Sequence, residues 1–180
     1  SNRVRAVLDT IDAESADSGT LRSLHFNDRL DYVQSCVRLD AATGQADHSR
    51  PPPTRGETGT VVSGLALAVA THSLLAGPLA ASRPLRVAVI GAGACALPAF
   101  LHSALPRATI EAVEVSAEVC AAARAHFGVA ELEASDRFRL VEGCGFEWLA
   151  TAAAGSTDVL IVDMEAGDAE VNIGEPANDD

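Results

Sequence analysis

From Leu85 onward the chain alternates short apolar runs with segments of helical length. The apolar runs are typical of buried strands, and they begin near Leu85, Thr109, Arg137 and Asp158. The segments between them are patterned as helices and read CALPAFLHSAL, AEVCAAARAHFG and FEWLATAAAG. Strands and helices that alternate in this way predict right-handed βαβ units and one parallel sheet that is buried on both faces.

A different pattern precedes this region. The runs TLRSLHF and LDYVQSCVRLD alternate partly between apolar and polar residues around the turn residues NDR, which predicts a β-hairpin over residues 21–39. Residues 41–60 are expected to be an exposed loop, because the three successive prolines of SRPPPTRGETG cannot join a sheet ladder. The run TVVSGLALAVATHSLLAG then predicts a buried helix that ends at Gly77 and Pro78.

Both ends of the chain are acidic and poor in periodic apolar residues. Residues 1–20 are expected to be a loosely ordered leader or one marginal helix, and no further strand is expected after Asp163. We therefore expect a leader over 1–20, a hairpin with its Pro-rich loop over 21–60, and a Rossmann-like α/β domain over 61–180 that stops after its fourth strand.

The charge balance limits the classes of partner. The chain has 13 basic and 25 acidic residues and a formal net charge of −12, which argues against nucleic acid or an anionic membrane surface as a partner. All the basic residues are arginines, so a pyridoxal Schiff base or a Walker phosphate loop is excluded. The four cysteines form no Cys-x-x-Cys pair, which indicates reduced thiols in the cytoplasm and no metal site. The most apolar stretch, residues 61–81, is too interrupted to predict a membrane span.

The run VAVIGAGACALPAF carries the strongest chemical signal. Glycine at Gly91 permits a tight turn after a strand, and glycine at Gly93 lets a ligand approach the backbone closely. Gly91, Gly93 and Ala96 satisfy the dinucleotide fingerprint Gly-x-Gly-x-x-Gly/Ala, so a nicotinamide or flavin enzyme is one hypothesis. Glu114, at the end of the next strand, can accept hydrogen bonds from ribose hydroxyls, and it suits nicotinamide dinucleotide or S-adenosylmethionine equally.

Four segments, RVAVIGAGACALPAF, IEAVEVSAEVCAAARAHFGV, DRFRLVEGCGFEWL and DVLIVD, resemble in order and spacing the class I S-adenosylmethionine-dependent methyltransferases. The Gly-x-Gly-x-x-x-Leu-Pro run and the Val-Glu-Val after it are similar to the spermidine synthase-like branch. RSLHFNDRLDYVQSCVRL and VVSGLALAV resemble the C-terminal domain of the methyltransferase-like family that modifies translation elongation factor 1-alpha. The resemblance spans about residues 21–168, and it implies S-adenosylmethionine as the cofactor.

The resemblance also implies roles for individual residues. The glycine turn would line the methionine part of the cofactor. The end of the second strand would bind its ribose, and the loop after the third strand would lie beside its adenine. The implied cofactor-binding residues are Gly91, Ala92, Gly93, Glu114, Val115, Gly143, Cys144, Gly145 and Asp163. Asp163, after the fourth strand, would also be the catalytic residue. Two positions depart from the family: Cys144 stands where an aspartate commonly accepts the adenine amino group, and Cys95 stands where glycine is usual.

The implied reaction is methylation of an amine, a lysine or an N-terminus, on a protein such as a translation elongation factor. The acidic surface suits such a basic acceptor. One alternative is an aminopropyltransferase of the spermidine synthase kind, whose Asp-x-x-Asp-Pro segment is replaced here by DMEAGDAE. Another is a non-catalytic binding module, which Cys95 and Cys144 favour. A homodimer stays open, Gln34 is a further candidate for the site, and Trp148 is expected in the core, with contact to the adenine as the alternative.

Overall fold

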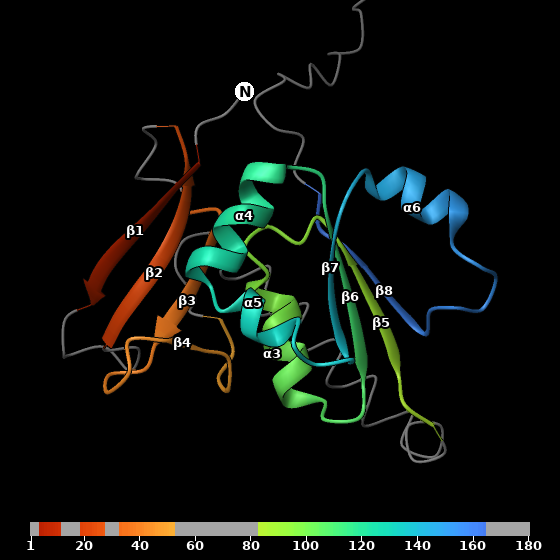
Figure 1. The fold of residues 1–180 in the computed structure, drawn as a ribbon. Coiled ribbons are helices and arrows are strands. Elements are labelled where there is room, and N and C mark those ends of the chain that lie inside the picture. The colour runs from red at the N-terminus through yellow and green to blue at the C-terminus, as the bar shows by residue number, and fades with distance from the viewer. Residues whose placement is uncertain (1–3, 12–18, 28–32, 53–82, 165–180) are drawn as a thin grey trace, which may run out of the picture.

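The computed structural model describes residues 4–11, 19–27, 33–52 and 83–164. Within these ranges the chain forms two four-stranded sheets with helices between them and beyond the second (Figure 1). The expected helix that ends at Gly77 and the acidic segment from residue 165 lie outside the described residues.

The second sheet is the predicted parallel sheet. Its strands are β5 (Arg86–Ile90), β6 (Thr109–Glu114), β7 (Phe138–Glu142) and β8 (Val159–Val162), in the order β7-β6-β5-β8. Every pairing is parallel. The four predicted strands are therefore confirmed. Because β8 pairs with β5 and not with β7, the chain crosses the sheet between β7 and β8, which brings the ends of β5 and β8 together.

Helices cover this sheet unequally. The helices α3 (Ala96–Ala104), α4 (Ala117–His126) and α5 (Val129–Leu132) lie on one face, and α6 (Gly145–Thr151) lies on the other (Figure 1). The main core forms on the first face, where Val87, Val89 and Ile110 pack with Leu97 and Leu101. The three predicted helices are confirmed, and the short α5 was not predicted.

The first sheet is antiparallel, in the order β1-β2-β3-β4. Its strands are β1 (Val4–Ile11), β2 (Gly19–Phe26), β3 (Ser35–Leu39) and the two-residue β4 (Ala46–Asp47). The predicted hairpin is present as β2 and β3, with Leu24 opposite Ser35. The expected loose leader is wrong for residues 4–11, which pair with β2 along their whole length, from Val4 opposite Phe26 to Ile11 opposite Gly19. Backbone pairing with a neighbouring strand, and not local periodicity, makes this segment a strand.

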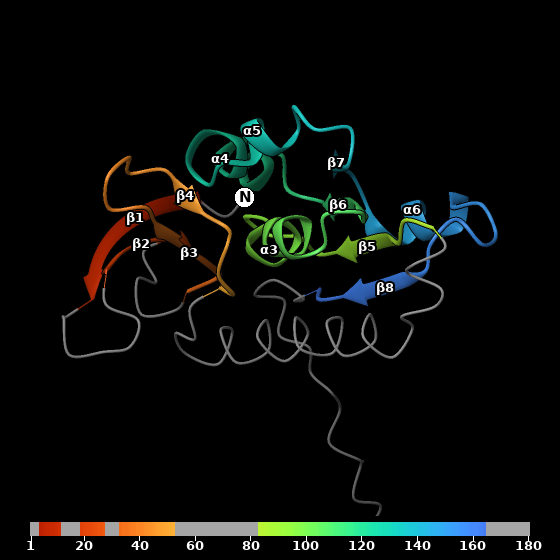
Figure 2. The same cartoon turned by 90° about the horizontal axis from the view of Figure 1, so that it is seen from below.

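The first sheet packs against the helices of the second (Figure 2). Leu24 and Val37 form a small core with residues of the parallel-sheet unit, Val119 and Phe127 among them. Arg22 of β2 and His48, directly after β4, also contact carbonyls at the end of α4: Arg22 donates to His126, and His48 Nε2 lies 3.0 Å from the carbonyl oxygen of Phe127. Burial lowers the pKa of His48, so the neutral ring donates its Nε2 hydrogen to that carbonyl.

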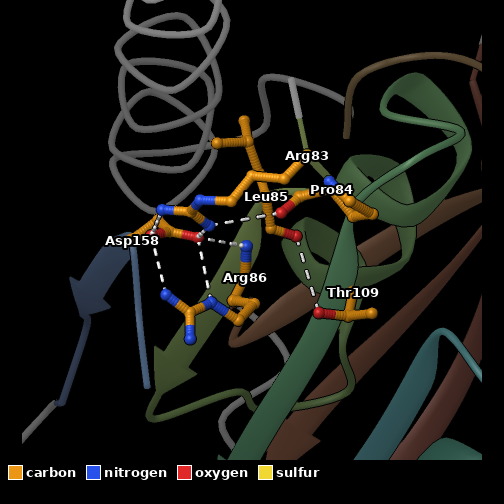
Figure 3. Close-up of polar contacts among 6 residues, drawn as sticks. All are labelled: Arg83, Pro84, Leu85, Arg86, Thr109 and Asp158. Atoms are coloured by element: carbon orange, nitrogen blue, oxygen red, sulfur yellow. Dashed lines mark hydrogen bonds and ion pairs between the residues drawn. The ribbon is translucent and has the colours of Figure 1, made fainter. Parts of the chain in front are cut away.

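An ion cluster joins β5 to β8 at the amino ends of the strands (Figure 3). The Asp158 carboxylate accepts bonds of 2.7 and 2.6 Å from the Arg83 guanidinium, and of 3.1 and 3.0 Å from that of Arg86. The Arg86 amide donates to the same carboxylate at 2.9 Å. These donors hold the pKa of Asp158 well below its usual range. The cluster fixes the β5–β8 edge at the end opposite to the glycine turn.

Candidate functional site

The structure brings the predicted site residues together at the carboxyl edge of the parallel sheet. Gly91 follows β5, Glu114 ends β6, Gly143 follows β7 and Asp163 follows β8. Backbone bonds of 2.9 Å tie these ends in sequence: Gly91 and Gly143 donate to Val113 and Glu114 respectively, and Asp163 donates to Ile90. Open α/β sheets place their ligands at this edge.

Each amide of the glycine turn already has an acceptor within the protein. Gly91 and Ala92 donate to the Val113 carbonyl at 2.9 and 3.0 Å, and Cys95 donates to the Ala92 carbonyl at 2.9 Å. Gly93 donates to Glu114 Oε2 at 2.9 Å, and Ala94 donates to Ser35 Oγ at 3.1 Å. The helix that follows begins Ala96-Leu97-Pro98, and proline has no amide hydrogen. The turn therefore has few donors left for a ligand.

Gly91 and Gly93 are required by the protein itself. Gly91 has φ +81°, and a β-carbon there would collide with the backbone carbonyl of Asp163. Gly93 has φ +54°, and a β-carbon there would lie 2.8 Å from Ser35 Oγ. Both values are in the left-handed region that favours glycine. At Gly93 the close approach comes from a side chain of the first sheet, whereas the sequence predicted that it would come from a ligand.

Glu114 is the central acidic residue of this edge. Its Oε2 accepts from Gly93, and its Oε1 accepts from the amide of Ser116 at 2.9 Å. The residue is 9% exposed. A carboxylate has about four acceptor positions, so each oxygen keeps capacity for one hydroxyl of a sugar. The carboxylate therefore fixes the turn and still suits a ribose.

Cys95 does not obstruct the turn. Its side chain is fully buried in the main core, and the residue has φ +63°. Burial raises the pKa of its thiol far above the ordinary value, and burial together with the Glu114 carboxylate raises the pKa of Cys120 to about 11. Both thiols are therefore protonated packing groups. The extra side chain at position 95 points into the protein and not toward a cofactor.

Cys144 lies in the loop after β7, and two exposed apolar side chains lie at the same edge of the sheet. Cys144 is the N-cap of α6, and within the described residues its side chain makes no capping hydrogen bond. Val115, after β6, is 71% exposed, and Phe146, in the first turn of α6, is 68% exposed. The sequence pattern indicates Val115 as a candidate site residue, but it does not indicate Phe146. The signal for Phe146 was a large aromatic residue directly after the Gly-Cys-Gly loop.

Asp163, which the resemblance predicts to close the site, lies partly buried beside Gly91. Its exposed neighbour Met164 faces Gly145, since a β-carbon on Gly145 would lie 3.5 Å from the Met164 sulfur. The other acidic candidates, Glu165 and Asp168, lie outside the described residues.

A hollow of about 260 Å³ lies at the amino ends of the strands, away from the glycine turn. Arg86, Glu111 and Trp148 contribute to its lining, and the Trp148 indole donates to Glu111 at 2.8 Å. Trp148 is therefore neither deep in the core nor at the carboxyl edge. In the part of the chain that the structure describes, His, Cys, Asp and Glu side chains form no group able to hold a metal ion. No helix in the same ranges is long and apolar enough to cross a membrane.

Comparison with known proteins agrees with this arrangement. No family model matches the chain. The human eEF1A lysine and N-terminal methyltransferase is 30% identical over 121 residues, which are 64% of this chain and 16% of the human protein. A polyamine aminopropyltransferase of Chromobacterium violaceum is 28% identical over 162 residues, which are 89% of this chain and 52% of that enzyme. A probable spermidine synthase from Corynebacterium glutamicum has the same fold, with a TM-score of 0.60 and 17% identity over 90% of this chain and 49% of its own.

The chain has a Rossmann-like α/β fold, and its relatives in sequence include an eEF1A methyltransferase and a polyamine aminopropyltransferase. The matched segment spans about a sixth of the human methyltransferase and about half of the aminopropyltransferase. The Rossmann-like fold accounts for the position of Glu114 and of the glycine turn at one edge of the sheet.

The structure brings one residue to the turn that the sequence does not indicate. Gln34 stays the predicted candidate from the hairpin, and its backbone amide donates to the Leu24 carbonyl within the first sheet. The next residue, Ser35, reaches the turn and accepts from Ala94. No sequence signal marks Ser35, because the contact joins residues that are 59 positions apart.

Proposed function

We propose that this chain binds S-adenosylmethionine at the carboxyl edge of β5, β6, β7 and β8, and transfers its methyl group to an amine of a protein. The observation that carries the proposal is the state of the glycine turn, in which the amides from Gly91 to Cys95 are engaged within the protein. A pyrophosphate needs free amide donors at this position. The amino-acid end of S-adenosylmethionine carries an ammonium group, which needs acceptors such as backbone carbonyls, and a single carboxylate, which needs fewer donors than a pyrophosphate. The turn therefore favours S-adenosylmethionine over a dinucleotide.

The remaining parts of the edge fit the other groups of this cofactor. Glu114 has acceptor capacity for the two ribose hydroxyls. The exposed side chains of Val115 and Phe146 offer apolar surface on which an adenine can pack. Cys144 is a weak acceptor for the adenine amino group, so this part of the site binds less tightly than an aspartate would.

When bound, S-adenosylmethionine supplies a methyl group on a positively charged sulfur, which an amine nitrogen displaces as the carbon–sulfur bond breaks and its electron pair stays on sulfur. The contribution of the chain is mainly alignment. Glu114 and the turn fix one reactant, and Asp163, beside Gly91, accepts a hydrogen bond from the acceptor amine and orients its lone pair. The acidic composition, with a net charge of −12, favours a basic acceptor.

The relative named as an eEF1A lysine and N-terminal methyltransferase supports the choice of acceptor class. We propose a lysine or N-terminal amine of a translation elongation factor, in the cytoplasm. The test is transfer of radiolabelled methyl from S-adenosylmethionine to purified elongation factor 1A and to cell extract. Asp163→Asn should reduce transfer at least about 10-fold, and the exposed control Asp136→Asn should leave it unchanged. Absence of labelled protein with the unaltered chain would contradict the proposal.

A second candidate is aminopropyl transfer, because the Chromobacterium violaceum aminopropyltransferase matches 89% of this chain. The assay offers decarboxylated S-adenosylmethionine with putrescine and measures spermidine. Spermidine formation without protein methylation would replace the first proposal. Cofactor binding without either transfer would indicate a binding module.

A further inference from the structure

Ser35 reaches the glycine turn from the first sheet. It is the first residue of β3, where Leu24 of β2 stands opposite it. Its hydroxyl oxygen accepts from the Ala94 amide at 3.1 Å. Ala94 is 1% exposed and belongs to the small core that also contains Leu24 and Val37. A buried amide that loses its acceptor is costly, so this bond matters to the local structure.

The hydroxyl also sets the space on one side of the turn. A β-carbon on Gly93 would lie 2.8 Å from Ser35 Oγ, so the oxygen is packed against the glycine. In the preceding peptide, the Gly93 amide donates to Glu114. The two successive amides of Gly93 and Ala94 are thus held by side chains from different sheets.

We propose that Ser35 is a positioning residue of the cofactor site: its hydroxyl fixes the Gly93–Ala94 peptide, and with it the Gly93 carbonyl, in the turn that binds the amino-acid end of the cofactor. The inference rests on the proposed function for the identity of the ligand. It makes the first sheet a part of the binding site through Ser35, whereas the sequence indicated the preceding residue, Gln34, as the candidate from this hairpin. Because Ser35 acts through the backbone, it governs cofactor affinity and not the transfer step.

The first test measures the turn without any cofactor. Amide hydrogen exchange at Ala94 is compared by NMR between the unaltered chain and Ser35→Ala. Exchange at Ala94 should become at least about 10-fold faster, because its acceptor is lost. The amides of Gly91 and Ala92, which donate to Val113, should keep their rates. Unchanged exchange at Ala94 would overturn the proposal.

The second test measures affinity by calorimetry with S-adenosylmethionine. Ser35→Ala should raise Kd about 3- to 10-fold, the range that one neutral hydrogen bond supplies, and Ser35→Thr, which keeps the hydroxyl, should restore it at least in part. The matched control is Ser49→Ala, because that hydroxyl is exposed and bonds to Asp47 within its own loop. In Ser35→Ala the KM for S-adenosylmethionine should rise with Kd, while the kcat of methyl transfer at saturating cofactor should keep its value.

The outcomes separate the two proposals. Equal Kd for the unaltered chain and Ser35→Ala contradicts the role of Ser35 and leaves the proposed function standing. If the unaltered chain binds no S-adenosylmethionine, the proposed function fails, and the role of Ser35 in this cofactor site fails with it. In that case faster exchange at Ala94 would retain for Ser35 a structural role only.

Discussion

Replacing Cys144 by aspartate tests the geometry of the adenine loop and of α6 together. Cys144 has φ −71° and ψ 123°, the extended conformation of an N-cap, and its carbonyl accepts the first bond of the helix from Trp148 at 2.9 Å. An aspartate in this position can accept from an amide of the first turn, where a thiol does so poorly. Glu147 stands three residues later, so Cys144→Asp also completes a capping box.

The expected magnitudes follow from these two roles. A good N-cap stabilises by about 1 kcal/mol, which for a chain of this size corresponds to a Tm rise of about 2–4 °C. An added acceptor for the adenine amino group is worth about 1–3 kcal/mol, or a Kd for S-adenosylmethionine that is roughly 5- to 150-fold lower. Thermal unfolding measures the first effect without cofactor, and calorimetry measures the second.

Two matched variants separate the effects of capping and charge. Cys144→Asn should raise Tm as aspartate does, since asparagine is an equally good N-cap, but it should tighten cofactor binding less because its oxygen is neutral. Cys144→Ala should do neither. A higher Tm with unchanged affinity would show that the loop is not the adenine site. If aspartate changes neither quantity, the interpretation of this loop is refuted.

Three further predictions concern stability. Asp158→Asn should lower the free energy of unfolding by about 1–3 kcal/mol, because the 10% exposed Asp158 side chain loses its charged hydrogen bonds. Urea unfolding measures this change, and the exposed control Asp136→Asn should leave the free energy of unfolding unchanged. Because the pKa of Asp158 is depressed, the carboxylate stabilises the fold above its ordinary pKa of about 4, and this stabilisation is lost as pH falls below that value. Asp158→Asn should therefore flatten the acid limb of a curve of stability against pH. The pKa of His48 is lowered, so the stability that neutral His48 provides is complete above about pH 6.5 and declines as pH falls. His48→Gln should remove this pH dependence of the free energy of unfolding, and an unchanged pH dependence would contradict the prediction. Gly91→Ala should cost about 1–3 kcal/mol more than Gly44→Ala in chemical unfolding, because both have positive φ but only Gly91 would meet a neighbouring backbone; equal costs would refute the close approach.

The sequence predicts the parallel sheet well, because its signal is local. Buried strands and amphipathic helices each carry a period of their own, and the crossover rule then places Gly91, Glu114 and Asp163 at one edge. The strand at Val4–Ile11 was not predicted, because pairing with β2 defines it. The four-residue α5 is too short to show a period.

The sequence predicts which candidate residues gather at the carboxyl edge, but it does not predict the bonds they make there. A fingerprint indicates that Gly91 and Gly93 must be glycine, yet it does not show which atoms approach them. In the structure those atoms belong to Asp163 and Ser35. These contacts depend on how distant parts of the chain pack together. Packing between segments so far apart in the chain produces no pattern in the sequence of either segment.

The most direct test of the proposed cofactor is a pair of calorimetric titrations of the unaltered chain, one with S-adenosylmethionine and one with NAD. The engaged amides of the turn and the free acceptor capacity of Glu114 predict binding of S-adenosylmethionine, with a Kd that rises at least about 10-fold in Glu114→Gln, and no measurable binding of NAD. Binding of NAD in preference to S-adenosylmethionine would contradict the assignment of this edge as an S-adenosylmethionine site.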